Sequence, residues 1–308
     1  ETSRSPALRR SREISMTLAT LSLVVLASFL HAGWNLLAKR AAHIGPLFVF
    51  AYNLVACIAY APWVLWRLSQ GVAGGMTWTW AAVGIVGLSG LIHLAYSLCL
   101  QRGYQTADLS VVYPVARGTG PMLSSLGAVL LLGEMPSGRA LAGLGLVVAG
   151  IGLIATQGRL AAFRKPGGVA GVQWGTATGG LIASYTVVDA YAVKALGIAP
   201  VVLDWCNNLL RFVLLAPIVA ADPRGAWEAL RGFRLVALGV GLLSPLSYIL
   251  VLAALDGGAP LSLVAPMREM SMMVGALLGM IVLGETAGPW RLVGCAVLIG
   301  GVVLLSSA

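Results

Sequence analysis

The sequence predicts an all-α, polytopic membrane protein with ten transmembrane helices arranged as two inverted five-helix repeats. Two observations lead to this fold class: a strongly apolar composition, and a residue pattern that occurs twice along the chain. Of the 308 residues, 58% are hydrophobic and only 10% are charged, whereas soluble domains carry roughly 25% charged residues. Nearly all of the chain is therefore expected to lie within a lipid bilayer.

The repeat is visible in short segments that match at a nearly constant separation. Leu-Ser-Val-Val-Tyr-Pro at 109–114 returns as Leu-Ser-Leu-Val-Ala-Pro at 261–266. Leu-Gly-Glu at 132–134 returns at 283–285. An internal duplication explains both matches. Because each copy holds an odd number of crossings, the two copies are predicted to enter the bilayer in opposite senses, as in many secondary transporters.

Ten apolar segments each approach or exceed the roughly 20 residues needed to cross hydrocarbon. In chain order they are residues 18–38, 47–66, 78–100, 107–132, 140–156, 172–193, 201–221, 235–255, 259–283 and 290–305. The first repeat is expected to occupy 16–157 and the second 158–308. Residues 1–15 are polar and precede Met16, so we interpret them as an N-terminal extension outside the fold.

The net charge of +9 indicates membrane topology and not nucleic-acid binding, because the basic residues are spread over loops and helix ends. On one predicted side of the membrane the loops hold Arg67, Arg139 and Lys194. The other side is richer in basic residues: Lys39, Arg40, Arg102, Arg159, Arg164, Lys165, Arg224, Arg231, Arg234 and Arg291. The positive-inside rule therefore favours an N-terminus outside the cell.

Charged side chains follow the prolines of the fourth and ninth segments. Arg117 lies three residues after Pro114. Its repeat mate, Glu269, lies three residues after Pro266 and next to Arg268. A proline within a helix removes a backbone donor and opens or kinks the helix, which frees carbonyl groups to line a cavity. An ionised group near a helix centre costs roughly 2.5 to 3.5 kcal/mol, so such residues usually face a cavity or a partner.

These charged positions have two interpretations. In the first, Arg117 and Arg268 bind an anionic group of a substrate, while Glu269 is a counter-ion or a proton carrier. In the second, Arg117 and Glu269 form a locked ion pair that holds the two halves of the chain together. The sequence favours the binding site.

Further polar and aromatic residues suit the wall of a cavity for an amphipathic organic solute. They are His31, Trp34 and Asn35 in the first segment, and Tyr96 and Tyr248, which are repeat mates in the third and eighth segments. Ordinary helix packing explains the same residues equally well. Asp189 lies deep in the sixth segment and is predicted to carry a proton or serve as a counter-ion, with a buried polar pair as the alternative.

Other motifs receive structural interpretations. Asp204, Asn208 and Arg211 share one helix face and are predicted to bond mainly to one another. Gly175 and Gly179 have the GxxxG spacing that lets helix backbones approach closely, within the chain or at a dimer face. The expected state is a monomer or a homodimer.

An enzyme is the competing class of protein. Gly87-Leu88-Ser89-Gly90 resembles the GxSG motif of rhomboid proteases, and His93 lies one helical turn after Ser89. In that family the base comes from a later helix, so close helix packing is the favoured interpretation of this motif. A lipid-handling membrane enzyme is a further alternative. The sequence has no metal-ligand spacing and no Walker A phosphate loop, so no metal or other cofactor is expected.

Several of these features together resemble the EamA family of the drug/metabolite transporter superfamily. They are Trp34, Asn35 and Lys39 in the first segment, the proline-containing fourth and ninth segments, and Gly133-Glu134 and Gly284-Glu285, which close them. The resemblance implies that the two Gly-Glu pairs are helix-end motifs and not substrate ligands.

The resemblance covers about residues 18–305 and implies a ten-helix transporter of the bacterial inner membrane. It implies a central cavity between the halves, lined by the first, third, fourth, sixth, eighth and ninth helices. The usual activity of the family is the export of amino acids or other small metabolites. Its members are expected to have both termini in the cytoplasm, which is opposite to what the loop charges here favour.

The substrate has two expected classes. The family implies an amino acid or a related organic solute, whose carboxylate and ammonium would suit Arg117 and Glu269. The opening His31-Ala32-Gly33-Trp34-Asn35 also resembles a branch associated with phosphonate metabolism. An organic phosphonate or another organic anion is therefore the alternative substrate, and it would suit Arg117 and Arg268.

Overall fold

The computed structural model describes residues 17–70, 78–106, 109–158, 163, 167–283 and 288–308, and its regular elements are all helices. In chain order they are α1 (Leu18–Lys39), the short 3-10 helix η1 (Ala42–Ile44), α2 (Pro46–Ser69), α3 (Trp80–Thr106), α4 (Leu109–Leu132), α5 (Gly138–Thr156), α6 (Gly168–Lys194), α7 (Pro200–Ala221), α8 (Pro223–Leu230), α9 (Arg234–Asp256), α10 (Leu261–Met267), α11 (Met270–Leu283) and α12 (Pro289–Ser306). The prediction of an all-α protein is confirmed.

Several helices begin where the sequence supplies an N-terminal signal. Four of them start with proline, whose fixed φ suits the first helical turn: α2, α7, α8 and α12. Two others start after a hydroxyl side chain that accepts a hydrogen bond from the first turn. Thr17 caps α1 and Ser137 caps α5 in this way.

Among the described residues, nine helical segments are long and apolar enough to cross a membrane. They correspond to nine of the ten predicted spans, with α10 and the start of α11 counted together as Leu261–Leu278. The predicted sixth span forms the 27-residue helix α6, which is not among the nine. Helix α6 buries several polar side chains, among them those of Thr178, Thr186 and Asp189.

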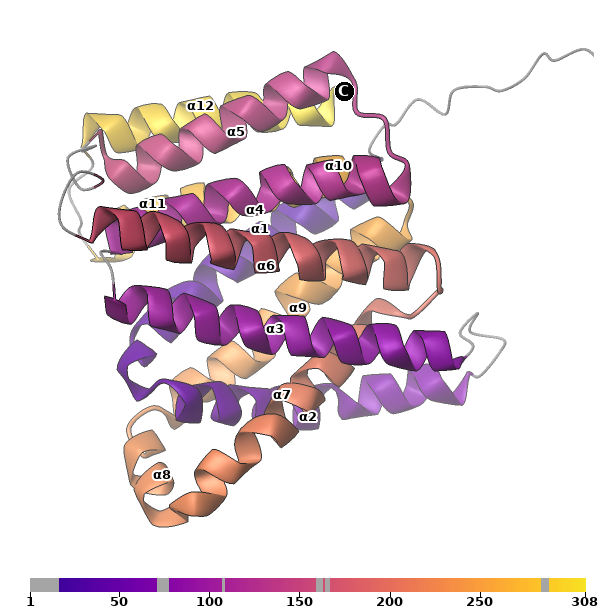
Figure 1. Ribbon diagram of the computed structural model, residues 1–308, viewed down its shortest axis with the longest axis vertical. Coiled ribbons are helices and arrows are strands. Elements are labelled where there is room, and N and C mark those ends of the chain that lie inside the picture. The colour runs from indigo at the N-terminus through magenta and orange to yellow at the C-terminus, as the bar shows by residue number, and fades with distance from the viewer. Residues whose placement is uncertain (1–16, 71–77, 107–108, 159–162, 164–166, 284–287) are drawn as a thin grey trace, which may run out of the picture.

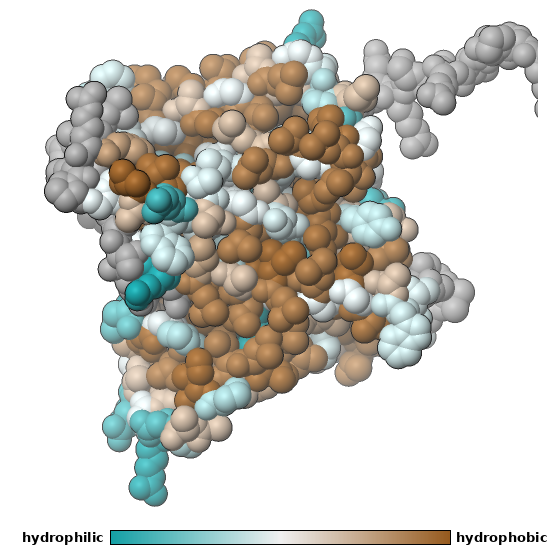
Figure 2. Space-filling view, in the orientation of Figure 1, coloured by the Kyte–Doolittle hydropathy of each residue, from teal (hydrophilic) through white to brown (hydrophobic). Residues whose placement is uncertain are grey.

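The helices form a layered bundle in which α3, α6 and α4 run side by side across the view of Figure 1. Helices α5 and α12 pair along one edge, and α2 and α7 pair along the opposite edge. Helices α1 and α9 pack on each other behind the front layer. The face in Figure 2 is apolar over most of these helices, and hydrophilic residues gather at its margins, as expected of a surface that meets lipid.

Glycines allow the closest helix pairs to form. Gly175 and Gly179 of α6 face α4, where an added Cβ would lie 2.9 Å from the Val112 carbonyl oxygen and 3.1 Å from that of Ala116, respectively. The GxxxG pair therefore packs within the chain. Gly143 of α5 meets the backbone of α12 in the same way.

The ninth predicted span is interrupted where the sequence places its charges. Helix α10 ends at Met267 and α11 begins at Met270, so Arg268 and Glu269 form a turn. The N–H of Glu269 donates to the Pro266 carbonyl at 3.0 Å, a three-residue closure in place of the α-helical one. The turn allows two successive charged side chains to be buried together, which the rotation between neighbouring positions of a regular helix disfavours.

The corresponding opening in the fourth span is absent, and that expectation was wrong. Helix α4 continues through Pro114 and Pro121. The repeat mates of Arg268 and Glu269 are Ala116 and Arg117, so only one charged side chain has to be buried here. One charge can face the core from an uninterrupted helix, and the proline alone does not break it.

Candidate functional site

Three charged side chains meet at the centre of the bundle, and we call them the arginine–glutamate cluster (Arg117, Arg268 and Glu269). Arg117 comes from α4, while the other two form the turn between α10 and α11. The Arg117 Nε lies 3.0 Å from Glu269 Oε2, and the Arg268 Nε lies 3.7 Å from Glu269 Oε1. All three side chains are buried. The cluster joins the two halves of the sequence through an ion pair.

The cluster is paired in charge but poorly satisfied in hydrogen bonds. Neither carboxylate oxygen of Glu269 has a hydrogen-bond partner, and neither have Nε and Nη2 of Arg268. Two guanidinium groups face one carboxylate, so the cluster carries an excess of one positive charge. Buried charged groups without partners are costly. An added anion could accept hydrogen bonds from Arg268 and balance the excess charge, whereas the Glu269 oxygens require a hydrogen-bond donor.

Polar side chains of α1 and α11 border this cluster. Arg117 Nη2 donates to Ser271 Oγ at 3.2 Å and lies 3.3 Å from His31 Nε2. The His31 ring meets Trp34 edge to face, with centroids 4.9 Å apart. The structure thus brings His31 into contact with Arg117. Trp34 lies one step further from it, and its indole N–H donates to Ser247 Oγ of α9 at 3.2 Å.

Asn35 is in the same helix but bonds locally. Its amide nitrogen donates to the carbonyl of His31 one turn earlier, at 2.8 Å. That bond uses one donor of the amide and leaves its oxygen available. The structure therefore places Asn35 one turn from His31, and within the described residues its side chain bonds to the backbone of its own helix.

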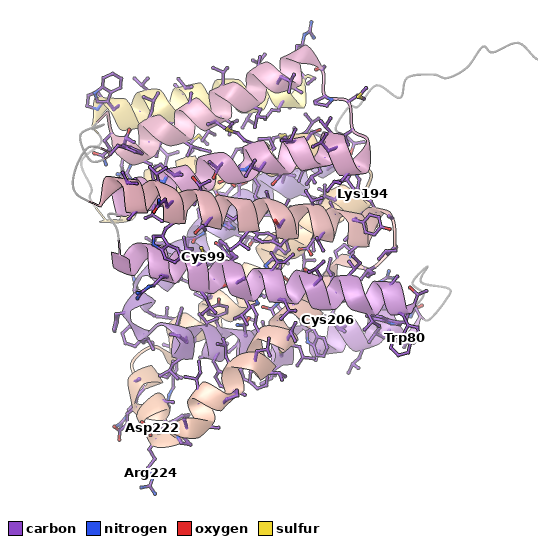
Figure 3. The ribbon with its side chains drawn as sticks, viewed as in Figure 1. Trp80, Cys99, Lys194, Cys206, Asp222 and Arg224 are labelled. Atoms are coloured by element: carbon purple, nitrogen blue, oxygen red, sulfur yellow. The ribbon has the colours of Figure 1, made fainter. Side chains whose placement is uncertain are left out.

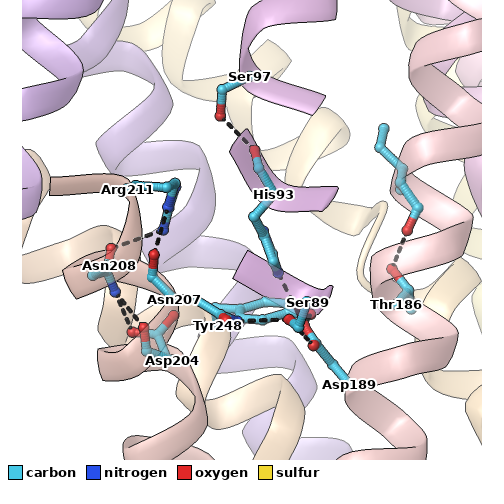
Figure 4. A network of polar contacts seen from close by, with 11 residues as sticks. Ser89, His93, Ser97, Thr186, Asp189, Asp204, Asn207, Asn208, Arg211 and Tyr248 are labelled. Atoms are coloured by element: carbon cyan, nitrogen blue, oxygen red, sulfur yellow. Dashed lines mark hydrogen bonds and ion pairs between the residues drawn. The ribbon is translucent and has the colours of Figure 1, made fainter. Parts of the chain in front are cut away.

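The second polar group is centred on Asp189, and we call it the Asp189 cluster (Ser89, His93, Asp189 and Tyr248). Ser89 Oγ donates to Asp189 Oδ1, and the Tyr248 hydroxyl donates to Oδ2 at 2.5 Å. His93 Nε2 lies 3.0 Å from Oδ2. Figure 4 shows these side chains converging on Asp189 from three helices, α3, α6 and α9. The fully buried carboxylate is therefore surrounded by hydrogen-bond donors.

Aromatic rings cover the Asp189 cluster. Tyr185, one turn before Asp189, stacks on His93 with ring centroids 4.0 Å apart. Tyr96 meets Tyr185 edge to face at 5.5 Å. Tyr185 and Tyr96 therefore form an aromatic layer beside His93 of the Asp189 cluster.

The predicted stripe on α7 bonds to itself, as expected. Asn208 Nδ2 donates to Asp204 Oδ2 at 2.8 Å, and Arg211 Nη2 donates to Asn208 Oδ1 at 2.8 Å. The neighbouring Asn207 donates to Ser89 Oγ at 2.9 Å and so connects α7 to the Asp189 cluster. Figure 4 shows the stripe beside that cluster.

The Asp189 cluster contains the residue types of a serine hydrolase but not their arrangement. In such enzymes the serine hydroxyl bonds to the histidine, which removes its proton, and the carboxylate orients the histidine. Here Ser89 donates directly to Asp189, and His93 bonds to the same carboxylate. The carboxylate stands where the histidine would have to be. Within the described ranges, no group of three His, Cys, Asp or Glu side chains is placed to hold a metal ion.

Comparison with known families identifies the first half of the chain. Residues 18–156 match the model of the EamA-like transporter family. This segment is an EamA-like transporter domain. The family consists of membrane transporters and is typically not enzymatic. The described residues form nine candidate membrane spans, as expected of a multi-pass membrane protein. No curated protein matches the sequence.

The fold of the chain beyond this segment is shared with a solved crystal structure. The similarity covers 94% of this chain and 96% of the other, with a TM-score of 0.71 and 19% sequence identity. At that identity the match establishes the fold alone. It extends the likeness beyond residues 18–156 into the second half.

The Gly133-Glu134 motif, which contributed to the family resemblance, forms a contact between the two halves of the chain. Gly133 has a φ of +68°, which turns the chain after α4. Glu134 then accepts hydrogen bonds from the N–H groups of Leu261 and Ser262 at 2.7 and 2.8 Å. Lys194 Nζ lies 3.2 Å from the same carboxylate. Glu134 therefore caps the N-terminus of α10.

We call Glu134 and Lys194 the end clamp, and Lys194 also donates to the Ala259 carbonyl at 2.8 Å. Figure 3 shows Lys194 at the end of α6. Burial alone would raise the pKa of the Glu134 carboxyl, but the Ser262 and Leu261 donors and the Lys194 ammonium outweigh it and lower the pKa. The repeat mate of this motif, Gly284-Glu285, lies outside the described residues, as does the side chain of Lys39.

Sequence reasoning placed the charged residues near each other but missed several of their partners. Tyr185 lies one turn before Asp189, so helical spacing offered a signal for it. Ser271 contacts Arg117, which lies 154 positions away, and spacing gave no signal for that contact. The pairing of Ser89 with Asp189 joins residues 100 positions apart. No local pattern in the sequence identifies such a pair.

Proposed function

We propose that the chain is a secondary active transporter that exports a small polar metabolite across the bacterial inner membrane by alternating access. The substrate is an amino acid or a related organic solute. The observation that carries this proposal is the buried arginine–glutamate cluster, with its excess positive charge and its unpartnered Arg268 donors. A membrane transporter has a use for a costly buried charge of this kind, because a substrate supplies the missing partner.

The helix contacts support a pair of inverted repeats, at 16–157 and 158–308. Packing of α4 on α6 has a counterpart in α11 on α1, and packing of α3 on α6 has one in α9 on α1. Helix α2 packs on α9 as α7 packs on α3. Helix α2 packs on α7, and α5 packs on α12, so in both pairs a helix contacts its own repeat mate. This is the pattern that a two-fold relation between the halves produces.

The carboxylate of an amino acid suits the two guanidinium groups of the arginine–glutamate cluster, because such pairs form strong bidentate hydrogen bonds. Its ammonium suits Glu269, whose oxygens have no hydrogen-bond donor. His31, Trp34, Asn35 and Tyr96 form the surrounding wall. An organic phosphonate or another organic anion is the alternative substrate, since guanidinium groups recognise phosphonate and carboxylate alike.

The two buried carboxylates take different roles in this proposal. Glu269 lies between Arg117 and Arg268 and is their counter-ion. Asp189 has a histidine and two hydroxyls as partners, and no arginine. Protonation of the His93–Asp189 pair would create a neutralised ion pair, so this pair can carry the coupling proton. Tyr248 belongs to α9 and donates a hydrogen bond to Asp189, so a change in the protonation of this pair also affects α9.

Alternating access requires one end of the bundle to close while the other opens. The end clamp closes the end at which α4, α6 and α9 finish and α10 begins. Its contacts cross between the halves of the chain, so opening of this end breaks them.

Counterflow in proteoliposomes tests the proposed activity. Vesicles with wild-type protein are loaded with a mixture of unlabelled amino acids, and the entry of each labelled amino acid is measured. We expect labelled solute to accumulate with wild type and not with Arg117→Gln, after both are shown to fold. Equal accumulation with Arg117→Gln and wild type would overturn the proposed site. A second series loaded with phosphonates decides between the two substrate classes.

A further inference from the structure

The segment between α7 and α9 lies at one face of the membrane. Helix α7 ends at Ala221 and α9 begins at Arg234, and both are candidate spans. The eight-residue helix α8 between them is too short to cross hydrocarbon. It packs on α2 and α7, and Ala226 is its one buried residue. The rest of α8 is therefore available at the membrane interface.

Helix α8 presents a tryptophan supported by an arginine. Trp227 is 62% exposed. The Arg234 guanidinium stands 3.8 Å from the centroid of its ring, a cation–π contact. Tryptophan is enriched at the level of lipid head groups, where its ring lies in the acyl region and its N–H meets water. Trp227 is placed as such an anchor.

Basic residues surround Trp227 on this face. Arg224, Arg231 and Arg234 are exposed. Figure 3 shows Arg224 projecting to the side of the bundle, away from the axes of α3 and α6. Because those axes follow the direction of membrane crossing, a sideways projection reaches toward surrounding lipid. The arginines therefore meet head groups before they meet bulk water.

A fourth arginine reaches the same face from the first half of the chain. The His43 ring meets Phe233 edge to face, with centroids 5.2 Å apart. This contact brings the turn after α1, including the exposed Arg40, next to the start of α9. Two acidic groups share the region. Asp222 accepts a hydrogen bond from the Gly225 N–H and caps α8, and Glu228 is exposed. The four arginines leave a positive excess.

We propose that this surface binds the head groups of anionic phospholipids, and we call it the α8 patch (Arg40, Arg224, Trp227, Arg231 and Arg234). Guanidinium groups bind phosphate through paired hydrogen bonds, and clusters of basic residues beside a span attract anionic lipid. Trp227 enters the acyl boundary beside them. The α8 patch rests on the membrane placement of α7 and α9 and is independent of the proposed substrate.

Native mass spectrometry of the full chain in detergent, titrated with phosphatidylglycerol or phosphatidylcholine, tests the α8 patch. We expect wild type to prefer phosphatidylglycerol. Arg224→Gln/Arg231→Gln should weaken its binding roughly 20-fold, since each arginine near a head group contributes about five-fold. The matched control, Arg67→Gln/Arg139→Gln, removes two basic residues from the opposite end of the bundle and should bind as wild type does.

Two further results bear on the α8 patch. Arg224→Lys/Arg231→Lys keeps the charge and should retain most of the preference for phosphatidylglycerol. Equal binding of the two lipids by wild type would overturn the proposal. An equal loss in the control variant would overturn it too, because general charge and not the α8 patch would then govern the binding.

Discussion

Asp189 and Glu269 are both fully buried carboxylates, yet their surroundings differ. Asp189 is contacted by Ser89, His93 and Tyr248, all within hydrogen-bond distance. Glu269 faces two guanidinium groups, but neither of its oxygens takes part in a hydrogen bond. The Asp189 carboxylate therefore has its hydrogen-bond partners within the protein, whereas the Glu269 carboxylate lacks them among the described residues.

The difference separates two tasks that a coupled transporter needs. A satisfied network such as the one around Asp189 holds one arrangement firmly and changes when a proton arrives. A charged site with unpartnered donors holds its shape only loosely and gains free energy when an anion completes it. In the proposed function, the Asp189 cluster therefore binds the proton and the arginine–glutamate cluster binds the substrate.

The largest expected effect on substrate affinity comes from removing the Arg268 guanidinium, whose Nε and Nη2 have no hydrogen-bond partner. Arg268→Gln should weaken the binding of the amino acids or phosphonates that stabilise wild type by about 30- to 5,000-fold, because loss of one partner in a buried charge contact costs about 2 to 5 kcal/mol. Isothermal titration calorimetry measures the change. Arg268→Lys is the matched control. Its affinity should lie between those of wild type and Arg268→Gln, because a lysine ammonium keeps the charge but cannot form the paired hydrogen bonds of a planar guanidinium. Unchanged affinity in Arg268→Gln would leave the cluster a structural ion pair.

Asp189→Asn tests the other half of the comparison. We expect the variant to bind substrate with nearly wild-type affinity but to lose the pH dependence of transport, because the His93–Asp189 pair can no longer take up a proton as a unit. The mismatched amide should also destabilise the fold by about 1 to 3 kcal/mol. Transport in proteoliposomes across a range of pH values measures the first effect. If transport by this variant kept the pH profile of wild type, Asp189 would not be the site of the coupling proton.

Glu269→Gln should act in the opposite direction on binding. Loss of the counter-ion raises the excess charge of the cluster, so an anion without an ammonium group should bind on the order of tenfold more tightly. Transport should keep its pH dependence, in contrast to Asp189→Asn. Titration with a simple organic phosphonate reports the affinity. If Glu269→Gln abolished the pH dependence instead, Glu269 would be the proton carrier and the two roles would be exchanged.

The smallest effect is expected at the end clamp. Glu134→Gln should destabilise the protein by about 1 to 2 kcal/mol at neutral pH, as loss of a charged helix cap does. The folded pKa of Glu134 is lowered below its ordinary value of 4.5. Its contribution is therefore complete above that value and is lost as the pH falls through the lowered pKa. The difference in melting temperature between wild type and Glu134→Gln should therefore become smaller in acid. A difference that stayed constant with pH would show that ionised Glu134 does not stabilise the end clamp.

Much of the fold was readable from the sequence because the bilayer restricts the choices. Apolar segments of sufficient length predicted most of the helices, and the predicted duplication paired Arg117 with Glu269, which the structure brings into contact. Pro114 and Pro266 gave the same local signal, yet only the second half breaks. The cause is the additional charge of Arg268, which depends on what the side chains meet in the core.

The partners of Asp189 and Glu134 were beyond sequence reasoning for a physical reason. Ser89 and Tyr248 reach Asp189 from other helices, and Leu261 meets Glu134 from the other half of the chain. Local periodicity assigns a residue to a helix face, but helix packing decides which faces meet. The Gly-Glu motif was readable as the end of α4, whereas its role as a cap for α10 required the structure.

Ligand-induced thermal stabilisation tests the central claim that the arginine–glutamate cluster recognises an anionic group. Purified protein is heated with separate panels of amino acids, phosphonates, organic cations and short lipids, alongside the folded Arg268→Gln variant. We expect a solute with a carboxylate or phosphonate to stabilise wild type, and we expect this stabilisation to be lost in Arg268→Gln. Stabilisation by organic cations or lipids alone, or an equal effect on both proteins, would contradict it.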